Sequence, residues 1–189
     1  LMLGGTALAA PAVVASTKPV HSLVAAVMDG IGEPGLIVKG AASPHTYSLR
    51  PSDAAALESA DVVFWTGHGL ELFLGDALAT LSTKARTVEL ADAEGIALLP
   101  MREGGAFEAH SHDEEDEHDH EEHDHAHGEE GDMHFWLDPE NAKLMVTKIA
   151  SVLAEVDPEN ASAYQVNAEA ELVRLDQLEL ADLTAIDPR

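Results

Sequence analysis

Short apolar runs separated by segments of helical periodicity dominate the first half of the chain. Four such runs are flanked by Gly, Pro, Ser or Asp, and an uninterrupted apolar run of this kind is typical of a strand buried on both faces. The alternation of strands and helices predicts a parallel sheet with right-handed crossovers. We therefore expect an α/β fold with a parallel four-stranded sheet and flanking helices. The predicted strands span residues 12–15, 36–38, 62–65 and 88–90.

The clearest helical pattern covers residues 69–81. Its apolar side chains recur at the spacing of one buried stripe along a helix. In a parallel sheet of this type, functional residues lie in the loops beyond the carboxyl ends of the strands, so the segments that follow each strand are the places to search for a site. The stripe consists of Leu70, Phe73, Leu74, Ala77, Leu78 and Leu81.

The last part of the chain has no strand-like run after Leu137. The string Asp-Pro-Glu-Asn occurs at 138–141 and at 157–160, and each copy offers Asp as an N-cap and Pro as the first helical residue. Two helices are therefore predicted, and we expect 139–187 to bridge toward a second lobe that this chain does not contain. The predicted buried stripes are Ala142, Met145, Val146, Ile149, Leu153 and Val156 in the first helix, and Tyr164, Ala168, Leu172, Leu175 and Leu178 in the second, which spans about 158–183.

Composition narrows the classes of partner. The chain has 189 residues with 10 Lys and Arg against 35 Asp and Glu, which gives a net charge of −25 and repels nucleic acid and anionic lipid. Its length allows one domain with a sizeable core but not two full-sized lobes. Because the chain has no cysteine, a disulfide, a thiolate metal site and a cysteine nucleophile are all excluded. Any bound metal must be held by nitrogen and oxygen ligands.

The first twelve residues, LMLGGTALAAPA, are small, apolar and uncharged. We interpret residues 1–12 as the remnant of an export signal, because Ala7-Leu8-Ala9 and Ala10-Pro11-Ala12 suit a signal peptidase. So short an apolar stretch cannot span a bilayer, and without cysteine there is no site for a lipid anchor. We therefore expect a soluble periplasmic protein with no stable membrane insertion, and a monomer.

The segment 108–132 is the most biased part of the chain. It holds seven histidines and thirteen acidic residues among its twenty-five positions, with no basic residue. Such a segment cannot bury enough apolar surface to offset its ordering entropy, so we predict a mobile loop within the lobe 13–138. Imidazole is the commonest neutral metal ligand, and nearly every ring here has a carboxylate beside it. The loop is therefore predicted to collect divalent transition metals at low affinity through His110, His112, His118, His120, His123, His125 and His127.

Two further histidines lie at predicted strand-to-helix transitions. His45 follows the second strand and precedes a helix that begins near Pro51, and His134 lies four residues before the first Asp-Pro cap. Taken singly, each is more often a hydrogen-bonded structural residue than a ligand. Their position beyond strand ends and the neighbouring histidine-rich loop favour a role as metal ligands.

At these residues the sequence resembles the zinc-uptake substrate-binding proteins of bacterial ABC transporters. The resemblance runs through the internal His/Asp/Glu loop and through four motifs: KPVHSLVAAVM at 18–28, SPHTYSLRPSD at 43–53, ADVVFWTGHGLELFL at 60–74 and MHFWLDPENA at 133–142. It implies one lobe of a two-lobed protein with a long bridging helix, in which His45 and His134 are the two zinc ligands of the amino-terminal lobe. The third histidine and the carboxylate that complete the family's site have no counterpart in this chain.

The function that the resemblance implies is capture of Zn²⁺ outside the cytoplasm for delivery to a membrane permease, with no enzymatic activity. A manganese- or iron-binding relative of the same superfamily and a periplasmic zinc buffer or metallochaperone are the alternatives, and a hydrolytic zinc enzyme is the most distant one. We interpret His21 as structural or as a residue of the cleft edge. We expect His68 and Glu71 to lie at the cleft rim or to line the cleft, and Tyr47 to support the site.

Overall fold

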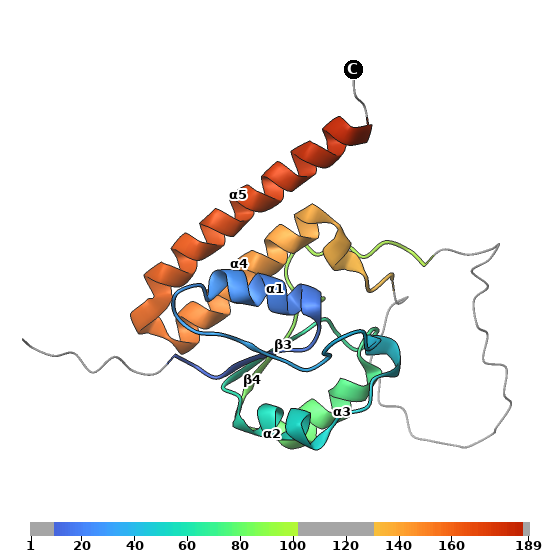
Figure 1. The fold of residues 1–189 in the computed structure, drawn as a ribbon, viewed down its shortest axis with the longest axis vertical. Helices are drawn as coiled ribbons and strands as arrows, with labels where there is room; N and C mark the ends of the chain where they lie inside the picture. Colours follow the sequence, from blue (N-terminus) through green and yellow to red (C-terminus); the bar gives the residue numbers. More distant parts are fainter. Residues whose placement is uncertain (1–9, 102–130, 187–189) are drawn as a thin grey trace, which may run out of the picture.

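Four parallel strands form the centre of the computed structural model, which describes residues 10–101 and 131–186 (Figure 1). The strands lie in the order β2-β1-β3-β4, so the direction of strand order changes between β1 and β3. Each neighbouring pair is parallel, which confirms the predicted α/β class. The strands are β1 (Val13–Ala15), β2 (Gly35–Leu36), β3 (Val62–Trp65) and β4 (Arg86–Glu89).

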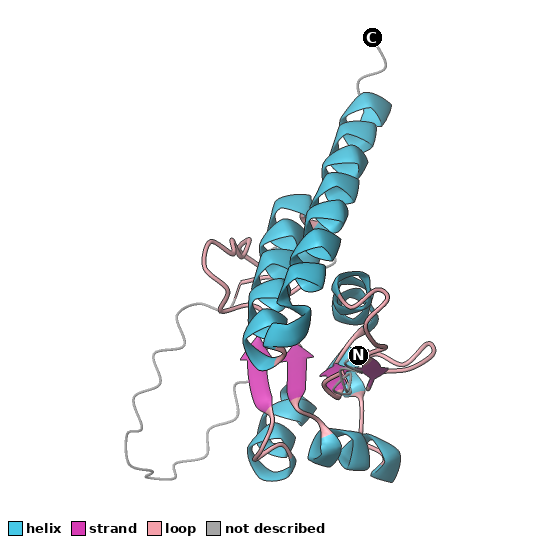
Figure 2. Ribbon diagram, turned by 90° about the vertical axis from the view of Figure 1, so that its left-hand side faces the viewer, coloured by secondary structure: helices cyan, strands magenta, loops and turns pink. Residues whose placement is uncertain are grey.

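Helices cover both faces of this sheet (Figure 2). One hydrophobic core joins alternate strand residues to α1, α4 and α5, and a second core joins the intervening strand residues to α2 and α3. This two-sided burial explains why the strands are apolar without interruption. The α-helices are α1 (Lys18–Val27), α2 (Pro51–Ser59), α3 (Leu72–Leu81), α4 (Pro139–Val156) and α5 (Ala161–Ile186), and the 3-10 turns are η1 (Pro44–Thr46), η2 (Phe135–Leu137) and η3 (Pro158–Asn160).

Strand positions follow the prediction with small shifts at β2 and β4. β2 ends at Leu36, yet the N–H groups of Ile37 and Val38 still donate to the carbonyls of Ala15 and Ser16, so the predicted run 36–38 lies beside β1 throughout. β4 begins at Arg86, two residues before the predicted apolar run. The apolar pattern missed these two residues because they are polar and exposed on the edge strand of the sheet.

The predicted helix 69–81 is three residues too long at its start. The structure begins α3 at Leu72 and folds residues 68–70 into a turn. The carboxylate of Glu71, which was expected at the cleft rim or in its lining, is buried, because it accepts hydrogen bonds from Ser16 and Gly67 at the ends of β1 and β3. Of the predicted stripe, Leu74 and Leu78 are buried within α3 as expected.

The two Asp-Pro-Glu-Asn strings behave differently. Asp138 caps α4, since its side chain accepts the Glu140 N–H at 2.9 Å and Pro139 is the first helical residue. Asp157 does not cap a helix: its side chain accepts from Asn160 and from the Tyr164 hydroxyl, and η3 precedes α5. The predicted burial is wrong for Val156 at the end of α4, which is 36% exposed, and for Leu178 within α5, which is 53% exposed.

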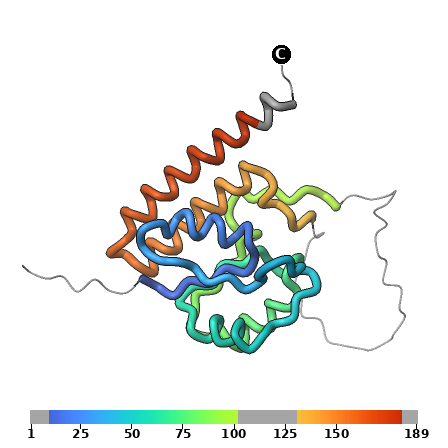
Figure 3. The backbone as a smooth tube through the Cα atoms, viewed as in Figure 1, coloured from blue at the N-terminus to red at the C-terminus, as the bar shows by residue number. Residues whose placement is uncertain are grey.

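The long helix α5 is attached to the lobe by polar contacts as well as apolar ones. Asn167 donates to the carbonyls of Val27 and Asp29 at 3.0 and 2.8 Å, where α1 ends. Lys143 of α4 binds both Asp176 and Glu179 of α5, at 2.6 and 3.0 Å. Toward its carboxyl end α5 extends past the start of α4 (Figure 3). Leu178 lies between Asp176 and Glu179 and is exposed all the same. No helix of the described ranges is both long enough and apolar enough to cross a bilayer.

Replacing Asn167 by Ala should lower the free energy of unfolding by about 1 kcal/mol, because two carbonyls at the end of α1 lose their donor while remaining partly accessible to water. Urea denaturation measures this loss. The matched control is Gln165→Ala, an exposed position two residues away on the same helix, which should change stability by less than about 0.5 kcal/mol. Equal effects of the two substitutions would contradict a specific role for Asn167.

Candidate metal site

His45 lies in η1, in the connection between β2 and α2. The Ser43 hydroxyl accepts the His45 N–H at 3.3 Å and Pro44 begins the turn, so short-range features of the sequence set this conformation. Two residues later the Tyr47 hydroxyl is buried and donates to Asp53 at 2.8 Å, which anchors the segment to the start of α2. The imidazole of His45 itself is exposed.

His134 lies at the N-cap of η2, directly before α4. Both its backbone N–H and its Nδ1 contact Oδ1 of Asp132, at 2.9 and 2.6 Å. Because a carboxylate only accepts, Nδ1 carries the proton and the lone pair is on Nε2. A carboxylate in this position orients the ring of a metal-binding histidine and raises its basicity. Asp132 was not singled out from the sequence, although its position two residues before His134 was a usable signal.

The structure brings His45 and His134 together across eighty-eight intervening residues. Their ring centroids lie 5.5 Å apart at an interplanar angle of 45°. Two imidazoles that share one zinc at bonds of about 2.0 to 2.1 Å and a tetrahedral angle have centroids roughly 5 Å apart. The observed separation therefore suits two nitrogen ligands of a single ion. Trp136 packs beside the His134 ring at a centroid distance of 5.2 Å.

The turn that carries His134 is held by residues on both sides of the segment 102–130. Asn141, which is buried, accepts the Ala97 N–H and donates to the carbonyls of Ala97 and Phe135. The Asp132 N–H donates to the Leu99 carbonyl at 2.7 Å. The chain therefore leaves the described fold and returns to it at adjacent points. The seven histidines predicted as a low-affinity loop lie between those points, outside the described residues.

The other residues considered as candidates have different surroundings. Nε2 of His21 lies 3.0 Å from the Pro34 carbonyl, which is the structural arrangement expected of it. Nδ1 of His68 lies 3.1 Å from a carboxylate oxygen of Glu89, the last residue of the edge strand β4. Among residues 10–101 and 131–186, no three His, Asp or Glu side chains converge on a common point. The described part of the chain thus supplies a pair of imidazoles but not a full ligand set.

Glu71 has a structural role and is not placed to bind a metal ion together with His45 and His134. Its side chain is fully buried, and its two carboxylate oxygens accept from the Ser16 hydroxyl and from the Gly67 N–H, respectively. Ser16 follows β1 and Gly67 follows β3, so one carboxylate joins the ends of the two central strands. Burial raises the pKa of Glu71, although these hydrogen bonds partly oppose the shift.

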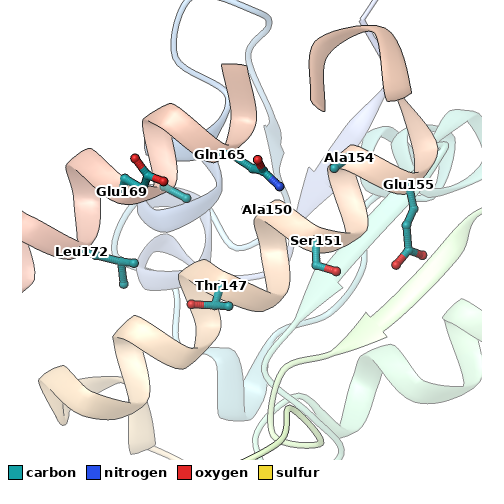
Figure 4. Close-up of a pocket in the computed structure, with 9 residues that line it drawn as sticks. Thr147, Ala150, Ser151, Ala154, Glu155, Gln165, Glu169 and Leu172 are labelled. Atoms are coloured by element: carbon teal, nitrogen blue, oxygen red, sulfur yellow. The ribbon is translucent and has the colours of Figure 1, made fainter. Parts of the chain in front are cut away.

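A groove with a volume of about 570 Å³ lies between α4 and α5 (Figure 4). Its lining includes small side chains such as Ala150 and Ser151, with Glu155 and Glu169 as its carboxylates. No histidine lines it, so a zinc site does not fit there as well as at the His45–His134 pair.

Comparison with known proteins is consistent with this geometry. Residues 13–186 match the family model described as zinc-uptake complex component A, periplasmic. The chain belongs to this family. It is 52% identical over 184 residues to the high-affinity zinc uptake system protein ZnuA of Brucella abortus (strain 2308), which covers 88% of this chain and 55% of that one. It is 34% identical over 187 residues to the protein of the same name from Yersinia pestis, covering 96% of this chain and 58% of the relative.

Solved structures share the fold. The Zn(II)-bound ZnuA-like domain of Streptococcus pneumoniae AdcA superposes with a TM-score of 0.69 at 22% identity, covering 90% of this chain and 54% of that one. The Mn-bound periplasmic metal binding protein from Candidatus Liberibacter asiaticus gives a TM-score of 0.66 at 18% identity, covering 86% and 52%. In both comparisons, as with the sequence relatives, this chain spans little more than half of the protein it matches.

The buried carboxylate of Glu71 should make stability depend on pH. Its pKa in the unfolded chain is near 4.5 and is higher in the folded state, so the unfolded chain releases this proton first as pH rises. The Glu71 contribution to folding therefore decreases above about pH 4.5 until the folded pKa is passed. In Glu71→Gln this contribution is absent, and the amide can still accept from Gly67 and donate to Ser16.

Urea denaturation of both proteins between about pH 4 and about pH 7 measures the effect. The stability of the parent relative to Glu71→Gln should fall across that window. A constant difference between the two proteins at every pH would show that Glu71 has the same pKa in both states.

Proposed function

We propose that this chain captures Zn²⁺ through His45 and His134 and that it forms part of the extracytoplasmic zinc-binding component of an ABC-type importer. The observation that carries the proposal is the approach of the two rings to 5.5 Å from separate loops, with Asp132 orienting one of them. Membership of the zinc-uptake family supports the same assignment. Zinc is the cargo here, and no bond is made or broken in it, so no enzymatic activity is proposed.

The chemistry of the pair favours zinc over manganese or iron. Neutral imidazole nitrogen is a preferred ligand for Zn²⁺, whereas Mn²⁺ is better matched by oxygen ligands. Zinc in a structural or transport site has four ligands as a rule, so two positions remain for water or for other protein groups. We propose that these come from the remainder of a two-lobed protein, since the relatives are nearly twice as long as this chain.

We also propose how the chain is divided, on the basis of its family membership. Residues 13–138 form the amino-terminal lobe, 139–187 contain the bridging helices, and 1–12 are the remnant of an export signal. The family description supports a periplasmic location, and a membrane permease is the proposed recipient of the ion. We further propose that the protein is a monomer and that the histidine-rich segment collects zinc at low affinity, with the negative charge of the chain raising the local cation concentration.

A zinc buffer that binds only through the histidine-rich segment is the rival function. An experiment can distinguish the buffer from the proposed site, because the residues that flank 102–130 lie side by side. The hydrogen bond from the Asp132 N–H to the Leu99 carbonyl shows this. A short Gly-Ser linker should therefore replace 102–130 without disturbing the His45–His134 pair. A buffer would lose all of its zinc binding on this replacement, whereas the proposed site would retain its tightest phase.

In this linker variant, His45→Ala and His134→Ala should each abolish the rise of the thermal midpoint with added zinc. A ligand that binds only the folded state stabilises it by about 2.7 kcal/mol at one hundred times its dissociation constant. A single remaining imidazole cannot hold the ion at such concentrations. Differential scanning fluorimetry with and without zinc measures the shift.

His68→Ala is the matched control, because this histidine is also exposed and is also paired with a carboxylate. It should retain the zinc-dependent shift of the parent. The site is wrongly assigned if His45→Ala responds to zinc as His68→Ala does, or if the linker variant itself shows no response.

A further inference from the structure

We propose that Gly69 is a positioning residue for His134, because only a residue without a side chain allows Met133 to pack where it does. The inference rests on the proposed zinc site and adds to it a specific determinant of ligand geometry. Gly69 lies in the turn between β3 and α3, sixty-four residues before Met133 in the sequence. Met133 directly precedes His134, so the position of its backbone sets that of the ligand.

Gly69 has no room for a methyl group. A Cβ built there lies 2.6 Å from Cγ and 3.1 Å from Sδ of Met133, well inside normal contact distance. The conflict involves Cγ, which is only two bonds from the Met133 backbone. A rotation at the far end of the side chain therefore cannot relieve it. The backbone of Gly69 does not have the positive φ that favours glycine. The contact with Met133 is therefore the reason why a larger residue is excluded.

The turn beneath Met133 cannot move away easily. Gly67 donates its N–H to the buried Glu71 carboxylate, and its carbonyl accepts from the N–H groups of Leu70 and Glu71. Gly67 also has a φ of +148°, and a Cβ there would clash with a carboxylate oxygen of Glu89. The Glu71 carboxylate ties this turn to Ser16 at the end of β1. The turn is thus bonded to the carboxyl ends of both central strands.

The turn that carries Met133 is held by hydrogen bonds on either side of this residue. Asp132 donates to the Leu99 carbonyl on one side, and Asn141 holds the Phe135 carbonyl on the other. Between these two points Met133 is 9% exposed and joins the larger hydrophobic core. A methyl group on Gly69 must therefore displace Met133, and the shift falls on the adjacent His134. Metal sites tolerate ligand displacements of only about 0.5 Å before affinity suffers.

The test is a double-mutant cycle in the linker variant, with zinc affinity measured by competition with a chromophoric chelator. Gly69→Ala should weaken binding tenfold or more. Met133→Ala, which adds no atoms, should weaken it severalfold by loosening the His134 turn. In Gly69→Ala/Met133→Ala the added methyl has nothing to displace, so affinity should equal that of Met133→Ala. Gly35→Ala is the control, because its Cβ would make only ordinary contacts of 3.6 and 3.7 Å.

Two results would overturn the proposal. One is a Gly69→Ala protein that binds zinc as tightly as Gly35→Ala, and the other is a double variant that remains as weak as Gly69→Ala. If Gly69→Ala does not fold, parental affinity in Met133→Ala is the overturning result. If the parent itself binds no zinc, the proposed function fails, and crystal structures without metal decide the positioning role. The His45–His134 ring separation should then change in Gly69→Ala and not in Gly35→Ala.

Discussion

The attachment of one buried carboxylate to the ends of both central strands is the constraint on which the candidate site depends. β1 and β3 are neighbours in the sheet, but the chain leaves them toward α1 on one face and α3 on the other. Glu71 binds Ser16 and Gly67 at this divergence and so fixes the turn that supports Met133. His134 therefore lies near His45 on a segment that packs, through Met133, against the turn at the end of β3, although both histidines lie outside the sheet and the α-helices.

Burial of Glu71 has a thermodynamic cost, since desolvation disfavours its ionised form and raises its pKa. Its two hydrogen bonds offset part of that cost. Strain or desolvation tolerated at the end of a sheet is common where geometry matters for function. The same region holds two positions where glycine is required by contact or by backbone conformation, Gly67 and Gly69, and all of these features lie beneath the His134 turn.

Sequence patterns predicted the parallel sheet and the approximate positions of the helices discussed above, because these depend on local periodicity and caps. Motifs also singled out His45 and His134, whose role as ligands stays a proposal. The patterns failed where a distant partner decides the outcome. Glu71 was expected at the cleft rim or in its lining, and only its contact with Ser16, fifty-five positions earlier, shows why it is buried. The patterns also failed at one nearer contact, because Asp157 matches Asp138 in local sequence but its carboxylate accepts from the Tyr164 hydroxyl, seven positions later. The separation of His45 and His134 is likewise a property of the tertiary fold.

X-ray absorption at the zinc edge tests the central claim most directly, on the variant in which 102–130 is replaced by a linker and one equivalent of zinc is bound. The account predicts two imidazole nitrogens at about 2.0 to 2.1 Å, with the outer-ring scattering that identifies histidine, and oxygen in the remaining positions. It also predicts the loss of that imidazole signal from the bound ion in His45→Ala/His134→Ala. An oxygen-only shell in the parent, or the same imidazole signal in the double variant, would contradict the assignment of the site.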